Sequence, residues 1–273
     1  DGLTTTAEKA KTFAANVPVA FQSDTSDGVG ARVSEWWEFS PDMTRINGEF
    51  RTSLIVDPPD GKMPYNEAGR ARLKALMAGV FTNFDGPEAR PSTERCLAGG
   101  SGATGAPLFV PRYNANYQFV QTPGYVVIAM EQNREVRIVR MSDKRLPDAM
   151  KRWMGDSIGH WDGDTLVVET INVHPGQRSY ISGAGKLTER FSRWSDGQIL
   201  YRFTVDDPSL YTSSWSGEMA LNVSPQPPFE YACHEGNYAL PSILAGARQM
   251  ERDGRPRQAI KPYAGNLDVS EGQ

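Results

Sequence analysis

The sequence is poor in the residues that hold metals or redox groups. Its 273 residues contain only two cysteines, Cys96 and Cys233, and three histidines. Metal sites built on thiols need several of them at short spacing, and these two stand far apart. They are therefore either bonded to each other or two unrelated buried thiols, and the even count fits both. A bond would close a very long loop, for which the chain-entropy model gives roughly 4–5 kcal/mol.

Charge and hydrophobicity exclude two classes of partner. The formal net charge is −4 and no basic stripe is present, so nucleic acid is not an expected partner. No apolar run is long enough to cross a bilayer, so no membrane span is expected. The 26 glycines and 19 prolines predict many turns and few long helices. These numbers are typical of a globular protein large enough to bury a core.

Strands are the main expected element. Two Asp-Gly pairs, Asp162-Gly163 and Asp196-Gly197, accept the positive φ of tight turns and predict antiparallel hairpins between 157–161 and 165–171 and between 186–194 and 198–205. Alternating patterns predict further strands at 32–39, 46–56, 117–122, 125–131, 135–140, 216–223 and 228–233. Short helices are expected at 6–15, after Asn66, at 147–153 and at 237–251.

A fold class follows from the order of these elements. Successive hairpins form a meander, and so long a meander leaves two exposed edges unless it closes or folds over. The sequence thus predicts a mainly β protein, a single antiparallel meander closed into a barrel or curved sandwich, with a few covering helices. We expect an N-terminal extension at 1–30, one β-rich domain at 31–253 and a loosely held tail at 254–273.

The strongest pair of candidate catalytic residues lies in the last third of the sequence. His234 and Glu235 follow the predicted strands, and an imidazole beside a carboxylate suits acid–base chemistry. They could equally fasten a loop, with Glu235 at the start of the following helix. His160 lies on a predicted strand and could line a barrel mouth or face solvent. Glu131 is the last residue of a predicted strand, and the other residues on its side of that strand are apolar. A carboxylate on such a face needs a partner, and Arg137 on the next strand is the expected one.

A second group suits ligand binding. Tyr113, Asn114, Asn116 and Gln121 form a polar-aromatic cluster leading into a strand, which favours binding of sugar or phenolic hydroxyls. Asparagines also serve turns, because they bond their own backbone. Among the tryptophans, Trp153 is the candidate for stacking on a ring, although most large aromatics are core.

The sequence favours no metal and no cofactor. Histidines without close spacing argue against a dedicated zinc or copper site, although His160, His234 and either Glu131 or Glu235 could form a two-His-one-carboxylate site. No nucleophile elbow and no dinucleotide fingerprint is present.

Several longer motifs resemble those of a large bacterial family of mostly hypothetical, exported proteins. They are TSLIVDPPDG at 52–61, ERC at 94–96, YNANY at 113–117, QTPGYVV at 121–127, WDGDTLVVET at 161–170 and YACHEGNY at 231–238. The resemblance runs from about residue 50 to residue 250. It implies a periplasmic or secreted protein, and export favours the disulfide. The family pattern more often has Arg at the position of His160, which weakens an obligatory catalytic role for that residue.

Together these features favour an exported, cofactor-free hydrolase or lyase. It would act on a small polar ring compound, such as a carbohydrate or a plant-derived aromatic glycoside, by His/carboxylate acid–base chemistry. The alternatives are a β-barrel protein that binds a small molecule without chemistry, and a metal-dependent enzyme with a His/carboxylate site. The expected partner is a small-molecule substrate, and the oligomeric state is left open.

Overall fold

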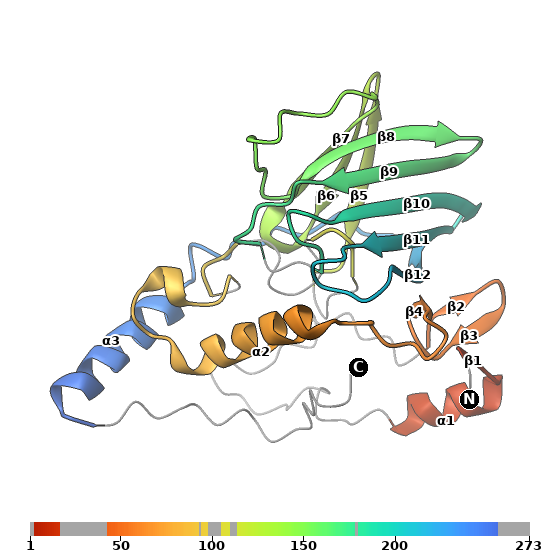
Figure 1. The fold of residues 1–273 in the computed structure, drawn as a ribbon. Coiled ribbons are helices and arrows are strands. Elements are labelled where there is room, and N and C mark those ends of the chain that lie inside the picture. The colour runs from red at the N-terminus through yellow and green to blue at the C-terminus, as the bar shows by residue number, and fades with distance from the viewer. Residues whose placement is uncertain are drawn as a thin grey trace.

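The computed structural model describes residues 3–16, 43–92, 94–97, 105–109, 114–177 and 180–255. Over these residues the protein is mainly β, with two sheets and three α-helices (Figure 1). The smaller sheet has the order β1-β3-β2 and comprises β1 (Thr4–Thr5), β2 (Arg45–Ile46) and β3 (Glu49–Arg51). None of the described helices is long and apolar enough to cross a membrane.

The larger sheet has nine strands in the described chain. Their order is β4-β12-β11-β10-β9-β8-β7-β6-β5. The strands are β4 (Ile55–Asp57), β5 (Tyr117–Thr122), β6 (Tyr125–Met130), β7 (Val136–Arg140), β8 (Asp156–Asp162), β9 (Thr165–Ile171), β10 (Lys186–Ser195), β11 (Gln198–Asp206) and β12 (Trp215–Asn222). Neighbours are antiparallel except β7 and β8, which run parallel and pair only at Val139↔Ser157 and Arg140↔Ile158.

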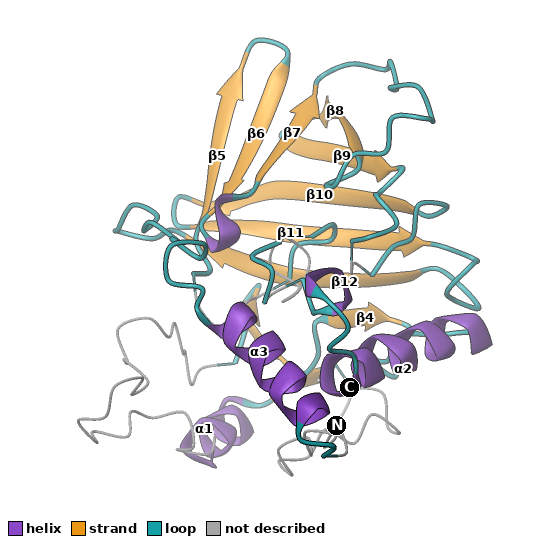
Figure 2. Ribbon diagram, turned by 90° about the vertical axis from the view of Figure 1, so that its left-hand side faces the viewer, coloured by secondary structure: helices purple, strands orange, loops and turns teal. Residues whose placement is uncertain are grey.

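The sheet is strongly twisted but open. β5 to β7 stand at a steep angle to β10 to β12 (Figure 2). β4 and β5 are its two edges, so the described residues form a curved sheet and no closed barrel. Of the two expected forms, the described residues are consistent with the curved sheet and do not form the closed barrel, for a topological reason. The parallel step from β7 to β8 interrupts the meander, and β4 rather than β5 pairs with β12.

Both Asp-Gly hairpins are confirmed. β8 pairs with β9 up to Asp162↔Thr165, and β10 pairs with β11 up to Ser195↔Gln198. Gly163 has φ +57°, the conformation for which a tight turn selects glycine. The limits of β5 to β12 agree with the expected ones to within one residue.

The core lies on the inner face of the large sheet. Alternate residues of β6, β9, β10, β11 and β12 are buried there, which confirms the period-two pattern. Fully or almost fully buried examples are Ile128, Val168, Leu187, Tyr201, Phe203, Val205, Trp215 and Met219. Segments outside the sheet cover them, including Leu108 and Ile181.

Two glycines on the inner face leave room for this packing. At Gly159 of β8, a Cβ would lie 2.8 Å from Cγ1 of Val139, so β7 packs against a strand without a side chain at that point. At Gly217 of β12, a Cβ would lie 2.4 Å from Cζ of Phe203. The curvature of the sheet therefore brings neighbouring side chains over positions that carry none.

Two of the three described helices, α1 and α2, start where a polar side chain caps them. α1 (Ala7–Asn16) follows Thr6, whose Oγ1 accepts a hydrogen bond from Lys9 N at 3.3 Å. α2 (Glu67–Thr82) follows Asn66, whose Oδ1 accepts one from Gly69 N at 2.9 Å. α3 (Ala239–Arg252) buries Ala247 and half-buries Ile243 and Leu244, as its apolar stripe predicts.

Other expectations are corrected. Residues 46–56 form no single strand, because the turn at Asn47-Gly48 folds β2 onto β3 and the chain breaks again before β4. The expected helix at 147–153 and strand at 228–233 are absent, the first replaced by turns and the second by irregular, Pro-flanked chain. The expected strand at 32–39, Tyr113, and most of the glycine-rich loop after Leu97 lie outside the described residues.

We expect Gly217→Ala to destabilise the fold by about 1–3 kcal/mol, the usual cost of overpacking a core. The added methyl group would overlap the Phe203 ring and would also lie 2.9 Å from the Leu54 carbonyl oxygen. Urea unfolding measures the loss. Gly246→Ala on α3 is the matched control, because a Cβ there meets nothing within 4 Å and alanine favours a helix. Equal stability of the two variants would contradict this packing.

Candidate functional site

The loop that joins β6 to β7 carries two carboxylates at its ends, Glu131 and Glu135. Met130 N donates to Glu135 O at 2.8 Å, which brings the two ends of the loop together. Asn133 and Arg134 between them have φ of +58° and +51°. Such values are uncommon for residues other than glycine, and arginine at a left-handed position carries a real cost. The strained backbone is thus concentrated between the two acids.

Glu131 is buried and held by two amides. Only 4% of the Glu131 residue is exposed to solvent. Asn114 Nδ2 donates to Oε1 at 2.5 Å, and Asn116 Nδ2 donates to Oε2 at 2.6 Å. Glu131 N also donates to Asn116 O at 3.0 Å. Two side-chain amides therefore fix the orientation of a carboxylate that is almost removed from water.

Glu135 lies in different surroundings. It is half-buried, and burial raises the pKa of its carboxyl group above the ordinary value. No described side chain donates a hydrogen bond to it. Both acids line one pocket of about 280 Å³. Its other lining residues are Gln118, Ala129, Met130, Arg134, Val136, Pro228 and Phe229. We call it the carboxylate pocket.

A larger groove of about 740 Å³ lies where β5 faces the ends of β10, β11 and β12. Aromatic and aliphatic side chains of the inner face line it, among them Tyr117, Phe119, Ile199 and Met219, together with Phe109 from the segment outside the sheet. Amides supply most of its uncharged polar groups, namely Asn116, Gln118, Gln198, Asn222 and Gln226. Its size and mixed lining are those of a small-molecule site.

The groove and the carboxylate pocket adjoin. Gln118 and Pro228 line both of them. Asn116 also connects them, because it lines the groove and its Nδ2 donates to Glu131. A ligand in the groove therefore lies next to the residues that orient Glu131. We treat the two cavities together as the candidate site.

Arg137 is not the partner of Glu131, which corrects the sequence-based expectation. Arg137 Nη2 instead lies 2.6 Å from Oε2 of Glu189 on β10, and both side chains are buried. Tyr201 Oη donates to Glu189 Oε1 at 2.7 Å and accepts from Leu108 N at 3.0 Å. Burial, and then the Glu189 charge, raise the pKa of the Tyr201 phenol well above its usual range, so it remains a donor. The expectation was wrong because the two side chains do not share a face of the sheet. Arg137 points toward the inner face, whereas Glu131 lies beyond the end of its strand.

The histidines lie elsewhere. His234 and Glu235 are exposed, in the turn before α3, and neither lines the groove or the carboxylate pocket. His160 is exposed near the end of β8, on the outer face opposite Val167. His174 accepts a hydrogen bond at Nδ1 from Gly176 N at 3.0 Å, which is a structural role in a turn.

Two binding candidates also lie outside both cavities. Gln121 is exposed near the β5–β6 turn. Trp153 is partly buried against the core and lies beside the His174 ring, with 5.2 Å between centroids. Of the sequence candidates, the structure therefore brings together Glu131, Asn114 and Asn116. It adds Glu135 and Gln118, which sequence reasoning missed. Two acids flanking a short strand connection were the available signal for Glu135.

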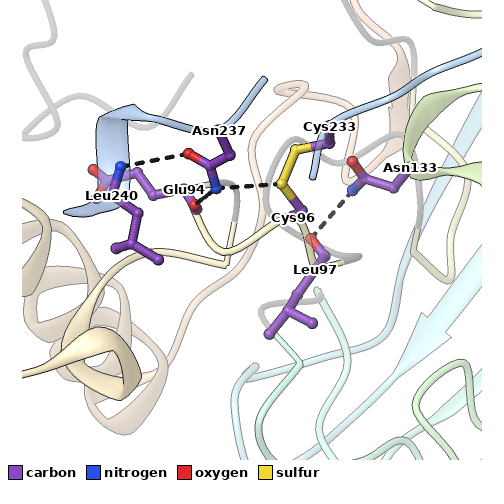
Figure 3. The surroundings of a disulfide bond; sticks show 7 residues. All are labelled: Glu94, Cys96, Leu97, Asn133, Cys233, Asn237 and Leu240. Carbon is purple, nitrogen blue, oxygen red and sulfur yellow. Dashed lines mark hydrogen bonds between the residues drawn. A yellow bond between two sulfur atoms is a disulfide. The ribbon is translucent and has the colours of Figure 1, made fainter. Parts of the chain in front are cut away.

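The disulfide between Cys96 and Cys233 is confirmed (Figure 3). It joins the segment after Glu94 to the turn that carries His234. Asn237 Nδ2 donates to Glu94 O at 2.7 Å and contacts Cys96 Sγ at 3.4 Å. Asn133 Nδ2, from the loop between the two acids, donates to Leu97 O at 3.2 Å. The disulfide segment thus also supports the loop of the carboxylate pocket.

Comparison with models of known families, with curated proteins and with solved structures finds no match. Within the described residues, no group of three or more His, Cys, Asp or Glu side chains is placed to hold a metal ion. The proposed combination of His160, His234 and a glutamate is therefore not assembled. The geometry of the carboxylate pocket and the groove remains the basis for a functional proposal.

We expect Glu135→Gln to change how stability depends on pH. Burial raises the folded pKa of Glu135 above its ordinary value, so folding favours its neutral form. Its stabilising contribution is present below the unfolded pKa and is lost as pH rises through the raised folded pKa. Glutamine is neutral throughout. The variant should therefore gain stability relative to the native protein as pH rises from below the unfolded pKa of a glutamate, about 4.3, to above the raised folded pKa, as measured by urea unfolding. A difference that is constant with pH, or reversed, would contradict the burial of this group.

Proposed function

We propose that the protein is a hydrolase or lyase that acts on a small polar ring compound, such as a carbohydrate or an aromatic glycoside. The observation that carries the proposal is the pair of acids in the carboxylate pocket. Glu131 accepts two amide hydrogen bonds, whereas Glu135 is partly buried with a raised pKa. Carboxyl groups whose surroundings differ in this way can divide the roles of proton acceptor and proton donor.

The proposed chemistry needs both roles. In hydrolysis, Glu135 would donate its proton to the leaving oxygen as the bond to the ring carbon breaks, and Glu131 would accept a proton from the attacking water. In elimination, Glu131 would accept a proton from carbon while Glu135 protonates the leaving oxygen. Asn114 and Asn116 would position Glu131. The groove would supply amides for hydroxyl groups and aromatic side chains for a ring.

A second candidate is binding without chemistry. The groove favours binding alone, because the size of the groove and its amide and aromatic lining suffice to hold a ligand. Asp196, the acid that lines the groove, projects into solvent with a relative side-chain exposure of 111% and so does not point at a bound ligand. The two candidates differ in whether the acids of the carboxylate pocket are needed for anything beyond affinity.

We also propose that the protein is exported. The support is the disulfide, because such bonds persist in oxidising compartments such as the periplasm or the extracellular space. The export-like sequence resemblance points the same way.

A panel of 4-nitrophenyl glycosides tests the enzymatic proposal, because release of the phenol is read by absorbance. Once a turned-over sugar is found, Glu131→Gln and Glu135→Gln should each lower kcat/KM by at least about 10²-fold, the usual range for a lost acid–base group. In Glu135→Gln, the fall of activity at high pH should also vanish, since it reflects loss of the Glu135 proton.

His234→Gln is the comparison variant. It is exposed and outside both cavities, so its kcat/KM should stay within about twofold of native. A loss of kcat/KM as large as in the glutamate variants would indicate that His234 is the catalytic residue, as the sequence predicts. Binding of a glycoside with no turnover by the native protein would favour the binding-only candidate.

A further inference from the structure

The outer face of the large sheet changes character between its two halves. Over β8 to β12 it carries ion pairs, including Lys186–Glu169, Arg190–Asp162 and Arg202–Glu218. This is the usual composition of a sheet face that meets water. Over β5 to β7 the same face is mostly apolar, with Gln118 and Thr122 on β5 and the Arg140–Asp156 ion pair at its far end. Four large side chains there, Val120, Tyr125, Val136 and Ile138, are between 40% and 48% exposed.

Strand register arranges the apolar side chains in rows. Gln118, Ala129 and Val136 stand side by side, followed by Val120, Val127 and Ile138, and then by Thr122, Tyr125 and Arg140. Residues of one row lie about 4.8 Å apart, and successive rows about 7 Å apart. The result is a surface roughly 10 Å wide and 13 Å long, whose middle row contains only branched aliphatic side chains. We call it the β5–β7 face.

The β5–β7 face is continuous with the carboxylate pocket. Its first row, Gln118, Ala129 and Val136, is also a wall of that pocket. Phe229, which is 60% exposed, lines the pocket as well. A molecule with its polar part at Glu131 and Glu135 would therefore extend either toward the groove or onto an apolar surface.

We propose that the β5–β7 face binds an apolar group, aryl or alkyl, attached to the polar ring at the carboxylate pocket. The ligand is thus amphipathic, and the face contributes affinity by removing apolar surface from water. The proposal rests on the carboxylate pocket as the site of the proposed function. It names the substrate class more narrowly: a polar ring with an apolar substituent, rather than a free sugar.

Binding of three matched probes tests this: methyl, hexyl and 2-naphthyl β-D-glucosides, followed by ¹⁵N NMR titration of the full chain. The hexyl and naphthyl compounds should bind at least about tenfold more tightly than the methyl compound. Their amide shifts should follow the three rows of the β5–β7 face. Comparison of the hexyl with the naphthyl compound shows whether the β5–β7 face prefers an aliphatic or an aromatic group.

Variants locate the effect. Ile138→Ser should remove most of the gain of the hexyl and naphthyl probes and leave methyl glucoside binding unchanged. Phe13→Ser is the control, because Phe13 is also exposed, at 57% against 45% for Ile138, and its helix α1 lies far from β5 to β7 (Figure 1). Both side chains are exposed, so both variants should keep the native melting temperature.

Three results would overturn the proposal: equal affinity for the three probes, no binding of any probe, or shifts away from the face. A fourth is a native dimer in sedimentation that Ile138→Ser dissociates, since the face would then be an interface between copies. Because the readout is binding, it separates the two proposals. Tight naphthyl binding without turnover by any glycoside removes the proposed reaction and keeps this inference. Equal turnover of glycosides with small and large apolar substituents would keep the proposed reaction and remove this inference.

Discussion

The buried ion pair between Arg137 and Glu189 is the interaction on which the shape of the molecule depends. β7 is joined to β8 by only two register pairs, so β5 to β7 would otherwise be attached to the rest of the sheet by a short parallel ladder. Arg137 reaches across the inner face to β10, at 2.6 Å from Glu189 and with both side chains at most 1% exposed. Tyr201 extends the contact to β11 and, through Leu108, to the covering segment. Breaking such a pair leaves an uncompensated buried charge, which is strongly destabilising.

Both cavities follow from that arrangement. The groove exists because β5, the edge of one half, faces the ends of β10 to β12 in the other half without pairing to them. The carboxylate pocket lies in the same half as β5, at the β6–β7 loop just before Arg137. A change in the angle between the halves would alter the distance to Glu131 from the groove amides of the other half, Gln198 on β11 and Asn222 on β12. The disulfide segment adds a second support, since Asn133 donates to the carbonyl of Leu97 beside it.

Local chemistry predicted the local features well. The Asp-Gly turns, the cap at Asn66 and the alternation along 198–205 each depend on a few neighbouring residues, and the structure confirms them. Features set by distant partners were not accessible. Nothing near Arg137 in sequence indicates Glu189, and only the topology shows that β4 takes the place beside β12. For the site, the cluster of Asn114, Asn116 and Glu131 was predicted in parts, but the amide–carboxylate bonds between them depend on how the β6–β7 loop folds back.

A double-mutant cycle on Arg137 and Glu189, measured by urea unfolding, tests the central claim most directly. Arg137→Met alone leaves the Glu189 charge buried without its cationic partner, with only the Tyr201 hydrogen bond remaining, and should cost about 3–5 kcal/mol. Combining it with Glu189→Gln removes that charge while keeping an acceptor for Tyr201. The account predicts that the double variant is more stable than Arg137→Met by at least about 2 kcal/mol. The loss in the double variant is then smaller than the sum of the losses in Arg137→Met and Glu189→Gln by at least that amount, a coupling energy typical of residues in direct contact. Losses that simply add would contradict the account, because the two side chains would then stabilise the fold independently and the pair would not hold the two halves of the sheet together.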